Sequence, residues 1–396
     1  MQQATAQLPA WAQPARAAAA GSAFASATHS CNAHSADLPS DIGHRLARDR
    51  LDSGRGETAC AAARDHGCGT ATMRILITGA GGFIGQTLTR VLLQNGHLKN
   101  RAGETAAIAE ILLLDTRLPA CSDRRLKPLQ ADLSSPATLQ AIAQWQPDSV
   151  FHLAAVLASA AELDPVHSLA INVSALAELI GAIGNKEAAP RLIFPSSIAV
   201  FGGLLPDHVD DDHLQRPQTS YGTQKAIAEL MLSDATRHGV VDARALRLPI
   251  VLVHPGPPTQ SVSDRIAAMV RDSAAGRPAV CPLRPDTRVA VVSVQTAVQN
   301  LITLHDADPV RLRGKRMLNQ PGLTVNMMEI VESIGRVIGP PDIGFAPDAA
   351  LKKIVDGWPK GFISTRAPSV GLVADTSFDD IVLNYLSFLA TGKSAA

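Results

Sequence analysis

The sequence predicts an α/β protein in which a parallel β-sheet is covered by helices on both faces. Short apolar runs, typical of buried strands, alternate along the chain with stretches in which apolar residues recur at helical spacing. A glycine-rich loop joins the first of these runs to the first helical stretch. Alternation of this kind is typical of parallel sheets with both faces buried. The 396 residues suffice for one large domain or for a domain with a smaller lobe.

The predicted elements follow one another in the order that such a sheet requires. The first strand is expected at residues 74–78 and the first helix at 83–94. Further strands are expected at residues 110–115, 126–130, 149–153, 191–195 and 244–248. Helices are expected at residues 136–146, with a proline near the start, and around 165–185 and 220–238. Together these segments make residues 73–248 the predicted nucleotide-binding domain.

The alternation stops after Pro249. Proline-rich and mixed segments follow, and then helical stretches that include an amphipathic one at the C-terminal end. We therefore expect residues 249–396 to form mainly a smaller substrate-binding lobe, with some segments returning to the larger domain.

Residues 1–72 differ in composition from the rest of the chain. Twenty of these 72 residues are alanine, and few are large apolar side chains. Such a segment has little to bury against the entropy cost of ordering, so we expect a disordered or non-native extension. A transit peptide is disfavoured because six acidic residues offset the arginines. Met73, directly before the first strand, would be a natural start of the protein.

Charge and cysteine content exclude several classes of function. The formal net charge is zero, which gives no reason to expect a nucleic-acid or acidic-membrane partner. The five cysteines are scattered without CxxC spacing, so neither a zinc site nor a disulfide framework is expected. We also expect no apolar run of the roughly 18 residues that span a membrane. The expectation is a cytoplasmic protein without a metal.

The loop at residues 79–85 (GAGGFIG) predicts a dinucleotide site. It lies between the first strand and the first helix, as in the Rossmann-type doubly wound sheet. Gly79 would allow the tight turn, Gly82 the approach of backbone to a pyrophosphate, and Gly85 close packing of helix on strand. Phe83 and Ile84 open the helix, whose N-terminus favours phosphate.

A carboxylate at the end of the second strand predicts NAD as the cofactor. Asp115 can accept hydrogen bonds from the adenosine ribose and would repel a 2′-phosphate. It lies 30 residues after Gly85 instead of the usual ~20, which indicates a longer connection around residues 96–107. Arg117 could accommodate a phosphate, so NADP stays an alternative. Residues that follow later strands are expected beside the adenine or the nicotinamide ribose, namely Asp132, Leu133, Ala154, Ala155 and Val156.

Two further segments carry candidate catalytic groups. Tyr221 and Lys225 are four residues apart, so on a helix their side chains share one face. A nearby ammonium, together with the charge of oxidised nicotinamide, favours phenolate. We therefore expect both charges to lower the pKa of Tyr221 from its usual value of about 10. Ser197 follows the strand at 191–195 and could hydrogen-bond a substrate oxygen. The neighbouring Ser196 is an alternative for that role.

These motifs resemble the extended short-chain dehydrogenases/reductases, the superfamily of NAD-dependent epimerases and dehydratases. The resemblance covers essentially all of residues 73–396 and is most specific at TGAGGFIG, SSIAVFG and SYGTQKA. It implies Ser197 as the catalytic serine, Tyr221 as the base and Lys225 as its partner. It also implies that Asn172, in INVSA, supports the active site and cofactor. Phe201 stands where many members have tyrosine.

A narrower resemblance points to a small sugar acid as substrate. The segments FPSSIAVFGGLLP, PQTSYGTQKAIAELML and AVCPLRPDTR resemble the D-erythronate dehydrogenases within the superfamily. That resemblance implies oxidation of a C2 hydroxyl to a 2-keto acid, such as D-erythronate to 2-dehydro-D-erythronate, with reduction of NAD. The chain departs from these relatives at residues 254–259 (HPGPPT), where they carry basic residues. This departure leaves the exact substrate open.

A carboxylate substrate needs a cation, and Arg288 is the candidate because a guanidinium binds carboxylate in a bidentate manner. An Arg with a surface or structural role is an equal alternative. Ser159 is expected to border the substrate, just past the nicotinamide loop. His208 and His213 lie among four aspartates, which we interpret as a solvated acidic loop instead of a metal site.

Two other functions remain open. A nucleotide-sugar epimerase or dehydratase would need a lobe that grips a nucleotide diphosphate, but the aromatic fraction of the chain is only 4%. A non-catalytic NAD-binding sensor is disfavoured by the complete set of Ser197, Tyr221 and Lys225. The resemblance also implies a possible homodimer through the long helices.

Overall fold

The computed structural model describes residues 72–184, 188–252, 261–312 and 314–392. The extension predicted over residues 1–72 lies outside these ranges except for Thr72. The segment at 254–259, where the chain departs from its sugar-acid relatives, also lies outside them.

One large sheet organises the described part of the chain. Its order is β12-β8-β6-β5-β1-β3-β2, with β4 paired to β3, and every pairing is parallel except that of β2 with β3. Its strands are β1 (Thr72–Thr78), β2 (His97–Lys99), β3 (Thr105–Asp115), β4 (Leu126–Gln130), β5 (Ser149–His152), β6 (Arg191–Ser197), β8 (Asp242–Leu248) and β12 (Met317–Asn319). The chain reverses its winding between β1 and β5. The predicted Rossmann-type doubly wound sheet is therefore confirmed.

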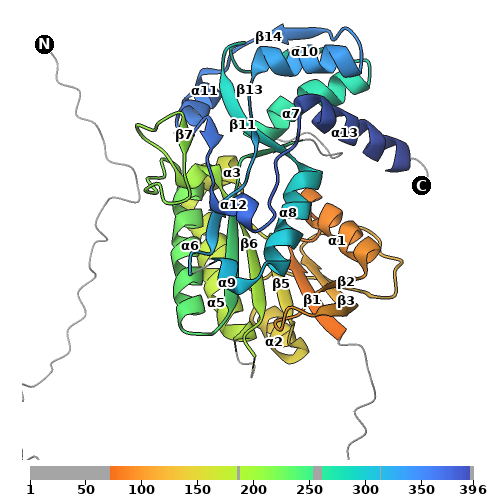
Figure 1. Cartoon of the computed structure of the whole chain (residues 1–396), viewed down its shortest axis with the longest axis vertical. Helices are drawn as coiled ribbons and strands as arrows, with labels where there is room; N and C mark the ends of the chain where they lie inside the picture. Colours follow the sequence, from red (N-terminus) through yellow and green to blue (C-terminus); the bar gives the residue numbers. More distant parts are fainter. Residues whose placement is uncertain (1–71, 185–187, 253–260, 313, 393–396) are drawn as a thin grey trace, which may run out of the picture. The chain divides into compact units, whose positions relative to one another are not determined.

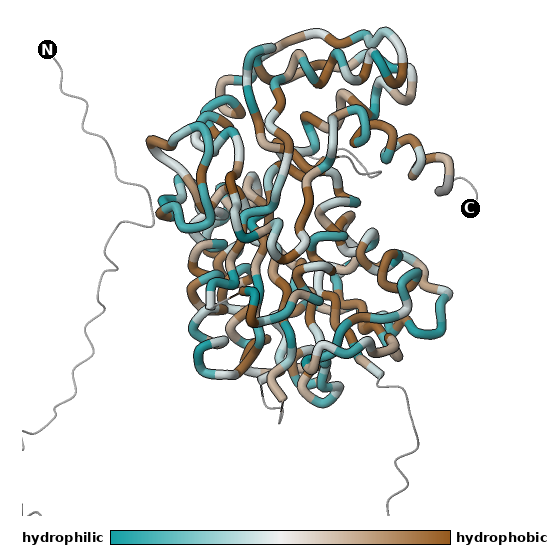
Figure 2. Tube along the Cα trace, viewed as in Figure 1, coloured by the Kyte–Doolittle hydropathy of each residue, from teal (hydrophilic) through white to brown (hydrophobic). Residues whose placement is uncertain are grey.

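Helices cover both faces of this sheet (Figure 1). The helices packed on it are α1 (Phe83–Asn95), α2 (Pro136–Trp145), α5 (Ala175–Ile183), α6 (Ser220–Arg237) and α8 (Val294–Asp306). Leu88 of α1 and Leu301 of α8 belong to the core on one face. Ile142 of α2, Leu176 of α5 and Leu232 of α6 belong to the core on the other. The strands between these cores are largely apolar, in keeping with burial on both faces (Figure 2).

A smaller lobe lies beyond the carboxyl ends of the large sheet (Figure 1). It contains the three-stranded sheet β13-β11-β9 and a separate apolar core. Its strands are β9 (Ile250–Leu252), β10 (Ala279–Cys281), β11 (Arg288–Ser293), β13 (Leu323–Asn326) and β14 (Ile343–Phe345), and a further pair joins β7 (His208–Val209) to β15 (Gly361–Phe362). The helices of this later chain are α7 (Val262–Ala274), α9 (Pro309–Leu312), α10 (Met327–Val337), α11 (Ala349–Asp356), α12 (Arg366–Ser369) and α13 (Phe378–Gly392). α8 and β12 belong to the large sheet, although in the chain they lie between segments of the smaller lobe. The predicted domain boundary between residues 248 and 249 therefore stays a prediction.

The long connection expected after the first helix is a β-hairpin. β2 follows α1 directly and pairs antiparallel with the start of β3, so that His97 lies opposite Ala107. β3 is consequently longer than the predicted strand and begins at Thr105. This extra pairing accounts for the wide spacing between Gly85 and Asp115.

One helical segment has the length and composition of a membrane span, although polar residues such as His167, Asn172 and Glu178 interrupt its apolar residues. Helices α4 (Pro165–Leu169), η2 (Ala170–Ser174) and α5 run on from one another, and the segment Pro165–Ile183 has a mean hydropathy of 1.6 over 18 residues. The residues that α5 buries belong to the core on one face of the large sheet. Packing against this sheet accounts for the apolar face of α5.

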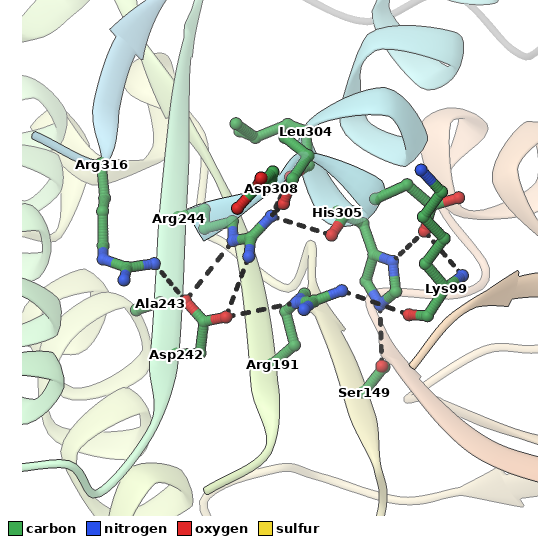
Figure 3. A network of polar contacts seen from close by, with 12 residues as sticks. Lys99, Ser149, Arg191, Asp242, Ala243, Arg244, Leu304, His305, Asp308 and Arg316 are labelled. Carbon is green, nitrogen blue, oxygen red and sulfur yellow. Dashed lines mark hydrogen bonds and ion pairs between the residues drawn. The ribbon is translucent and has the colours of Figure 1, made fainter. Parts of the chain in front are cut away.

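A buried polar network joins the amino ends of the strands to the end of α8 (Figure 3). The Asp242 carboxylate forms ion pairs with Arg191, Arg244 and Arg316. Nη1 of Arg244, which is fully buried, also donates to the carbonyls of Leu304, His305 and Ala307 at 2.6–2.9 Å. Burial opposes the charge on Asp242, but the guanidinium groups hold the pKa of its carboxyl below the usual range.

Asp242→Asn is expected to lower the free energy of unfolding by about 3–5 kcal/mol, because it leaves buried guanidinium groups without their carboxylate. Urea denaturation measures the loss. Asp234→Asn is the matched control, since Asp234 pairs with Arg237 on the exposed face of α6 and such pairs contribute at most about 1 kcal/mol. Equal effects of the two substitutions would contradict the central role of Asp242.

We expect His305 to make the folded state less stable as the pH decreases from about 6.5 to 4. Burial lowers the pKa of His305 to about 4, and its ring bonds Ser149 and Asp306 at 2.8 and 2.7 Å. The unfolded chain, in which a histidine has a pKa of about 6.5, therefore binds this proton at a higher pH than the folded chain does. This difference lowers the free energy of unfolding by about 2 kcal/mol at pH 5. Urea midpoints from pH 7.5 to 5 should fall less steeply for His305→Gln than for the wild type. The exposed His238→Gln should leave the slope unchanged, and the same slope in His305→Gln would refute the assignment.

Candidate active site

The glycine loop between β1 and α1 is too close to neighbouring backbone to carry side chains. Gly79 has a φ of +71°, and a Cβ there would lie 2.6 Å from the amide nitrogen of Ala154. A Cβ at Gly81 would lie 1.9 Å from the carbonyl oxygen of Arg117, and one at Gly85 would lie 2.4 Å from that of Gly79. Gly82 is the N-cap of α1 and has no side chain to occupy the helix N-terminus. A phosphate can therefore approach this terminus closely.

A cavity of about 570 Å³ lies at the carboxyl ends of the large sheet, where the winding reverses between β1 and β5. It is large enough for a small-molecule ligand. Most of the predicted site residues line it, namely Gly79, Gly82, Phe83, Ile84, Gly85, Asp115, Asp132, Leu133, Ala154, Ala155, Val156, Ser196, Ser197, Tyr221 and Lys225. The glycine cradle and the helix terminus fit a dinucleotide, so these residues would hold NAD.

Asp115 fixes the shape of the glycine loop as well as lining the cavity. Its Oδ2 accepts a hydrogen bond from the Gly81 amide at 2.9 Å, and its Oδ1 accepts one from the Arg117 amide at 3.1 Å. Asp132 is held similarly, since its Oδ1 accepts from both the amide and the hydroxyl of Ser134. These bonds hold the pKa of Asp132 below its usual value. Both carboxylates thus lie at the cavity wall, each held by hydrogen bonds from backbone amides.

Asn172 supports the cavity from behind and does not line it. It lies within η2, a π-helical turn of the kind often found at functional sites. Its amide exchanges hydrogen bonds with the backbone of Val156 at 2.8 and 2.9 Å and donates to Gln224 of α6 at 2.7 Å. Asn172 therefore ties the loop after β5 to the helix that carries Tyr221 and Lys225.

Close packing brings Ser197 to Tyr221. Ser197 ends β6, and its Oγ accepts from the Ala199 amide at 3.1 Å, which starts the short helix η3 (Ile198–Val200). α6 begins against this turn, since a Cβ at Gly222 would lie 2.0 Å from the carbonyl oxygen of Ala199. The Ser197 hydroxyl consequently lies close enough to Tyr221 to favour a lower pKa of the phenol.

Burial shifts the pKa of both members of the Tyr–Lys pair. It raises the pKa of Tyr221 to about 12, although the interaction with Ser197 acts in the opposite direction. Burial also lowers the pKa of Lys225 to about 7. The expected lowering of the tyrosine pKa by Lys225 together with oxidised nicotinamide stays a prediction.

The two serines at the end of β6 have different partners. Ser196 is buried, and its hydroxyl donates to Oε1 of Glu229. Ser197 is only half-buried and lies beside Tyr221. The geometry thus favours Ser197 over Ser196 as the group that contacts a reacting oxygen.

Two predicted substrate residues do not line the cavity. Arg288 begins β11 with 45% of its side chain exposed and lies 3.5 Å from a carboxylate oxygen of Asp207. Ser159 is exposed on α3 (Ala158–Leu163). The positions of both residues depend on turns of the chain that no local motif specifies. Neither Arg288 nor Ser159 is therefore among the residues that line the cavity with Tyr221.

Other residues line the cavity that sequence reasoning did not identify. They are His167, Trp358 and segments at 248–251 and 261–263. Residues 248–251 follow β8, so the rule that ligands bind at carboxyl ends of strands could have found them. Trp358 comes from the lobe more than 130 residues after Tyr221, and nothing in its local sequence signals this position.

The histidines receive no metal-binding role. Asp211 and Asp212 of the acidic loop form ion pairs with Arg366, and Asp212 also pairs with Lys315. Across the residues that the structure describes, no group of three or more His, Cys, Asp or Glu side chains could hold a metal ion. The acidic loop is instead joined to the C-terminal segment by these ion pairs.

Asp115→Ala is expected to weaken NAD binding about tenfold or more, because the glycine loop loses a charge-assisted hydrogen bond worth about 1.5–3 kcal/mol. Isothermal calorimetry measures the Kd. Asp123→Ala is the control, since this carboxylate pairs with Arg125 and does not line the cavity. An unchanged Kd in Asp115→Ala would contradict the role given to this residue.

Comparisons with known proteins agree with the fold and with the cavity. Residues 75–294 match the model of the NAD dependent epimerase/dehydratase family. D-erythronate dehydrogenase of Cupriavidus necator is 38% identical in sequence, and the match covers 81% of this chain and 100% of the relative. D-erythronate dehydrogenase of Haemophilus influenzae is 31% identical, and the match covers 80% of this chain and 99% of the relative. A crystal structure described as a nucleoside-diphosphate-sugar epimerase from Agrobacterium tumefaciens has a TM-score of 0.73 and 33% identity, and covers 80% of this chain and 96% of its own. The chain therefore belongs to the NAD-dependent epimerase/dehydratase family.

Proposed function

We propose that this protein is an NAD-dependent dehydrogenase that oxidises a hydroxyl of a small sugar acid, with D-erythronate as the first candidate substrate. The product would then be 2-dehydro-D-erythronate. The observation that carries the proposal is one cavity lined by both the glycine cradle and the set Ser197, Tyr221 and Lys225. The similarity to two D-erythronate dehydrogenases over nearly their full lengths supports the choice of substrate.

The proposed chemistry divides between the bound NAD, which accepts a hydride from the substrate carbon, and three side chains. Ser197 would hold the reacting oxygen beside the Tyr221 hydroxyl, since both residues line the cavity. The Tyr221 phenolate takes the hydroxyl proton as general base. Lys225 lies with Nζ 5.7 Å from the centre of the Tyr221 ring and would support both the phenolate and the nicotinamide ribose. The raised pKa of Tyr221 implies that oxidation quickens as the pH increases towards the alkaline range.

A second candidate function is epimerisation or dehydration of a nucleotide sugar. The specific observation in its favour is the 33% identity to the Agrobacterium tumefaciens structure described as a nucleoside-diphosphate-sugar epimerase. Such a reaction returns the hydride to the substrate and releases no NADH. Net formation of NADH therefore separates the two functions.

Four- and five-carbon sugar acids with NAD are expected to give NADH, measured by its absorbance, whereas UDP-sugars are expected to be left unchanged. Tyr221→Phe should lower kcat by about 100-fold or more, since general base catalysis contributes about 10²–10⁴-fold. Tyr385→Phe is the matched control because Tyr385, the other tyrosine of the chain, is buried in the core of the lobe. Undiminished turnover in Tyr221→Phe, or no NADH from any sugar acid, would refute the proposal.

A further inference from the structure

We propose that Glu229 is a positioning residue of this active site, which keeps the ammonium charge on Lys225 and fixes the serine pair at the end of β6. The inference rests on the proposed function, because it assigns Glu229 a role through Lys225 and Ser196. Glu229 does not line the cavity. Its carboxylate acts from one helical turn behind the cavity wall.

The placement of Glu229 follows from the helix. Tyr221, Lys225 and Glu229 are spaced at four-residue intervals on α6, so their side chains share one face. Tyr221 and Lys225 line the cavity, whereas Glu229 is 3% exposed. The Glu229 carboxylate thus lies beneath the Lys225 side chain, in the interior between α6 and the sheet.

The Glu229 carboxylate is fully supplied with donors. Its Oε1 accepts from the Ser196 hydroxyl and from Nε of Arg247 at 3.0 Å. Its Oε2 accepts from Nη2 of Arg247 at 2.8 Å and from Gln215 at 2.6 Å. Bonds of this kind to a guanidinium are stronger than those between neutral groups. The Glu229–Arg247 ion pair therefore lies at a buried position on the helix that carries Tyr221 and Lys225.

Two local contacts favour an ammonium on Lys225, but its burial opposes the charge. Its Nζ donates to the carbonyl oxygen of Pro195 at 2.8 Å and lies 4.2 Å from the centre of the Phe194 ring. Burial lowers the pKa of Lys225 to about 7, and the charge of Glu229 acts in the opposite direction. Without this carboxylate, a larger share of Lys225 would be neutral at pH 7.

The other titratable groups around Lys225 do not replace Glu229. His152 of β5 is 1% exposed, and burial together with the charge of Lys225 lowers its pKa to about 3, so it is neutral at pH 7. Tyr221, on the same helix, is also neutral because its pKa is raised to about 12. Arg247 of β8 is the partner of Glu229 and carries a positive charge. Among the described residues, the Glu229 carboxylate supplies the negative charge that raises the pKa of Lys225.

The same carboxylate sets the geometry of the serines. Ser196 and Ser197 are consecutive residues at the end of β6, so their side chains point in different directions. Because Glu229 holds the Ser196 hydroxyl in the interior, Ser197 is directed to the cavity side and Tyr221. One buried carboxylate thereby links the lysine and the serine of the proposed reaction.

The test measures NADH binding as a function of pH, by the change in NADH fluorescence, and so does not require the substrate. We expect affinity to fall as Lys225 loses its proton, and Lys225→Met to abolish this transition. Glu229→Gln should move the transition to lower pH by about one unit, because it removes the negative charge that opposes the desolvation of Lys225. An unmoved transition would overturn the proposal.

Three controls separate this role from a structural one. The double variant Glu229→Gln/Arg247→Gln leaves no unpaired guanidinium and should still move the transition in NADH affinity to lower pH. It therefore provides the same test if the single variant Glu229→Gln does not fold. Ser196→Ala retains the carboxylate charge and should leave the transition in place while lowering kcat. Asp375→Asn removes a different buried carboxylate, which binds Ser293 and Thr296, and should lower stability alone. A shift in Asp375→Asn would overturn the proposal, whereas absence of NADH binding by the wild type would instead refute the proposed function.

Discussion

The position of the large sheet depends on one carboxylate shared among three guanidinium groups. Asp242 begins β8, Arg191 begins β6, and Arg244 reaches from β8 to the last carbonyls of α8. A buried Arg is tolerated only when its donors are satisfied, so this arrangement permits few alternatives. The register of β6 and β8 is thereby fixed at their amino ends. The opposite ends of the same two strands carry Ser197 and Leu248, which line the cavity. The positions of these two residues therefore depend on the register that the distant network fixes.

The ionisable groups at the two edges of the sheet differ in how far ion pairs compensate their burial. At the amino edge, ion pairs hold Asp242 ionised and its pKa low. At the carboxyl edge, burial acts on Tyr221 and Lys225 with fewer compensating partners and moves both pKa values towards the neutral forms. Perturbed ionisation of this kind is typical of functional sites. Asn172 contributes no charge there, but its hydrogen bonds to Val156 and Gln224 keep the loop and the catalytic helix in fixed relation.

What could be predicted from the sequence was local. The GAGGFIG loop, Asp115 and the Tyr221–Lys225 pair carry their geometry in their spacing, and the structure places all of them at one cavity. The orientation of Ser196 depends on Glu229, 33 residues later, which no motif announces. Arg288 was assigned by its chemistry alone, and the path of the lobe directs it to Asp207 instead. The effect of burial on the pKa of Tyr221 could not be predicted either, because the sequence does not report how deeply a side chain is buried.

The edge of the large sheet is completed late in the chain. β12 (Met317–Asn319) pairs with β8 although about 70 residues separate the two strands in the chain. During synthesis, β8 therefore leaves the ribosome well before its outer partner exists, and its free edge stays open to pairing with other chains in that interval. The late position of β12 thus has a kinetic consequence. The large sheet is completed only after β9, β10 and β11 have been made, whereas the segment that brings Trp358 to the cavity follows β12 and is made later still.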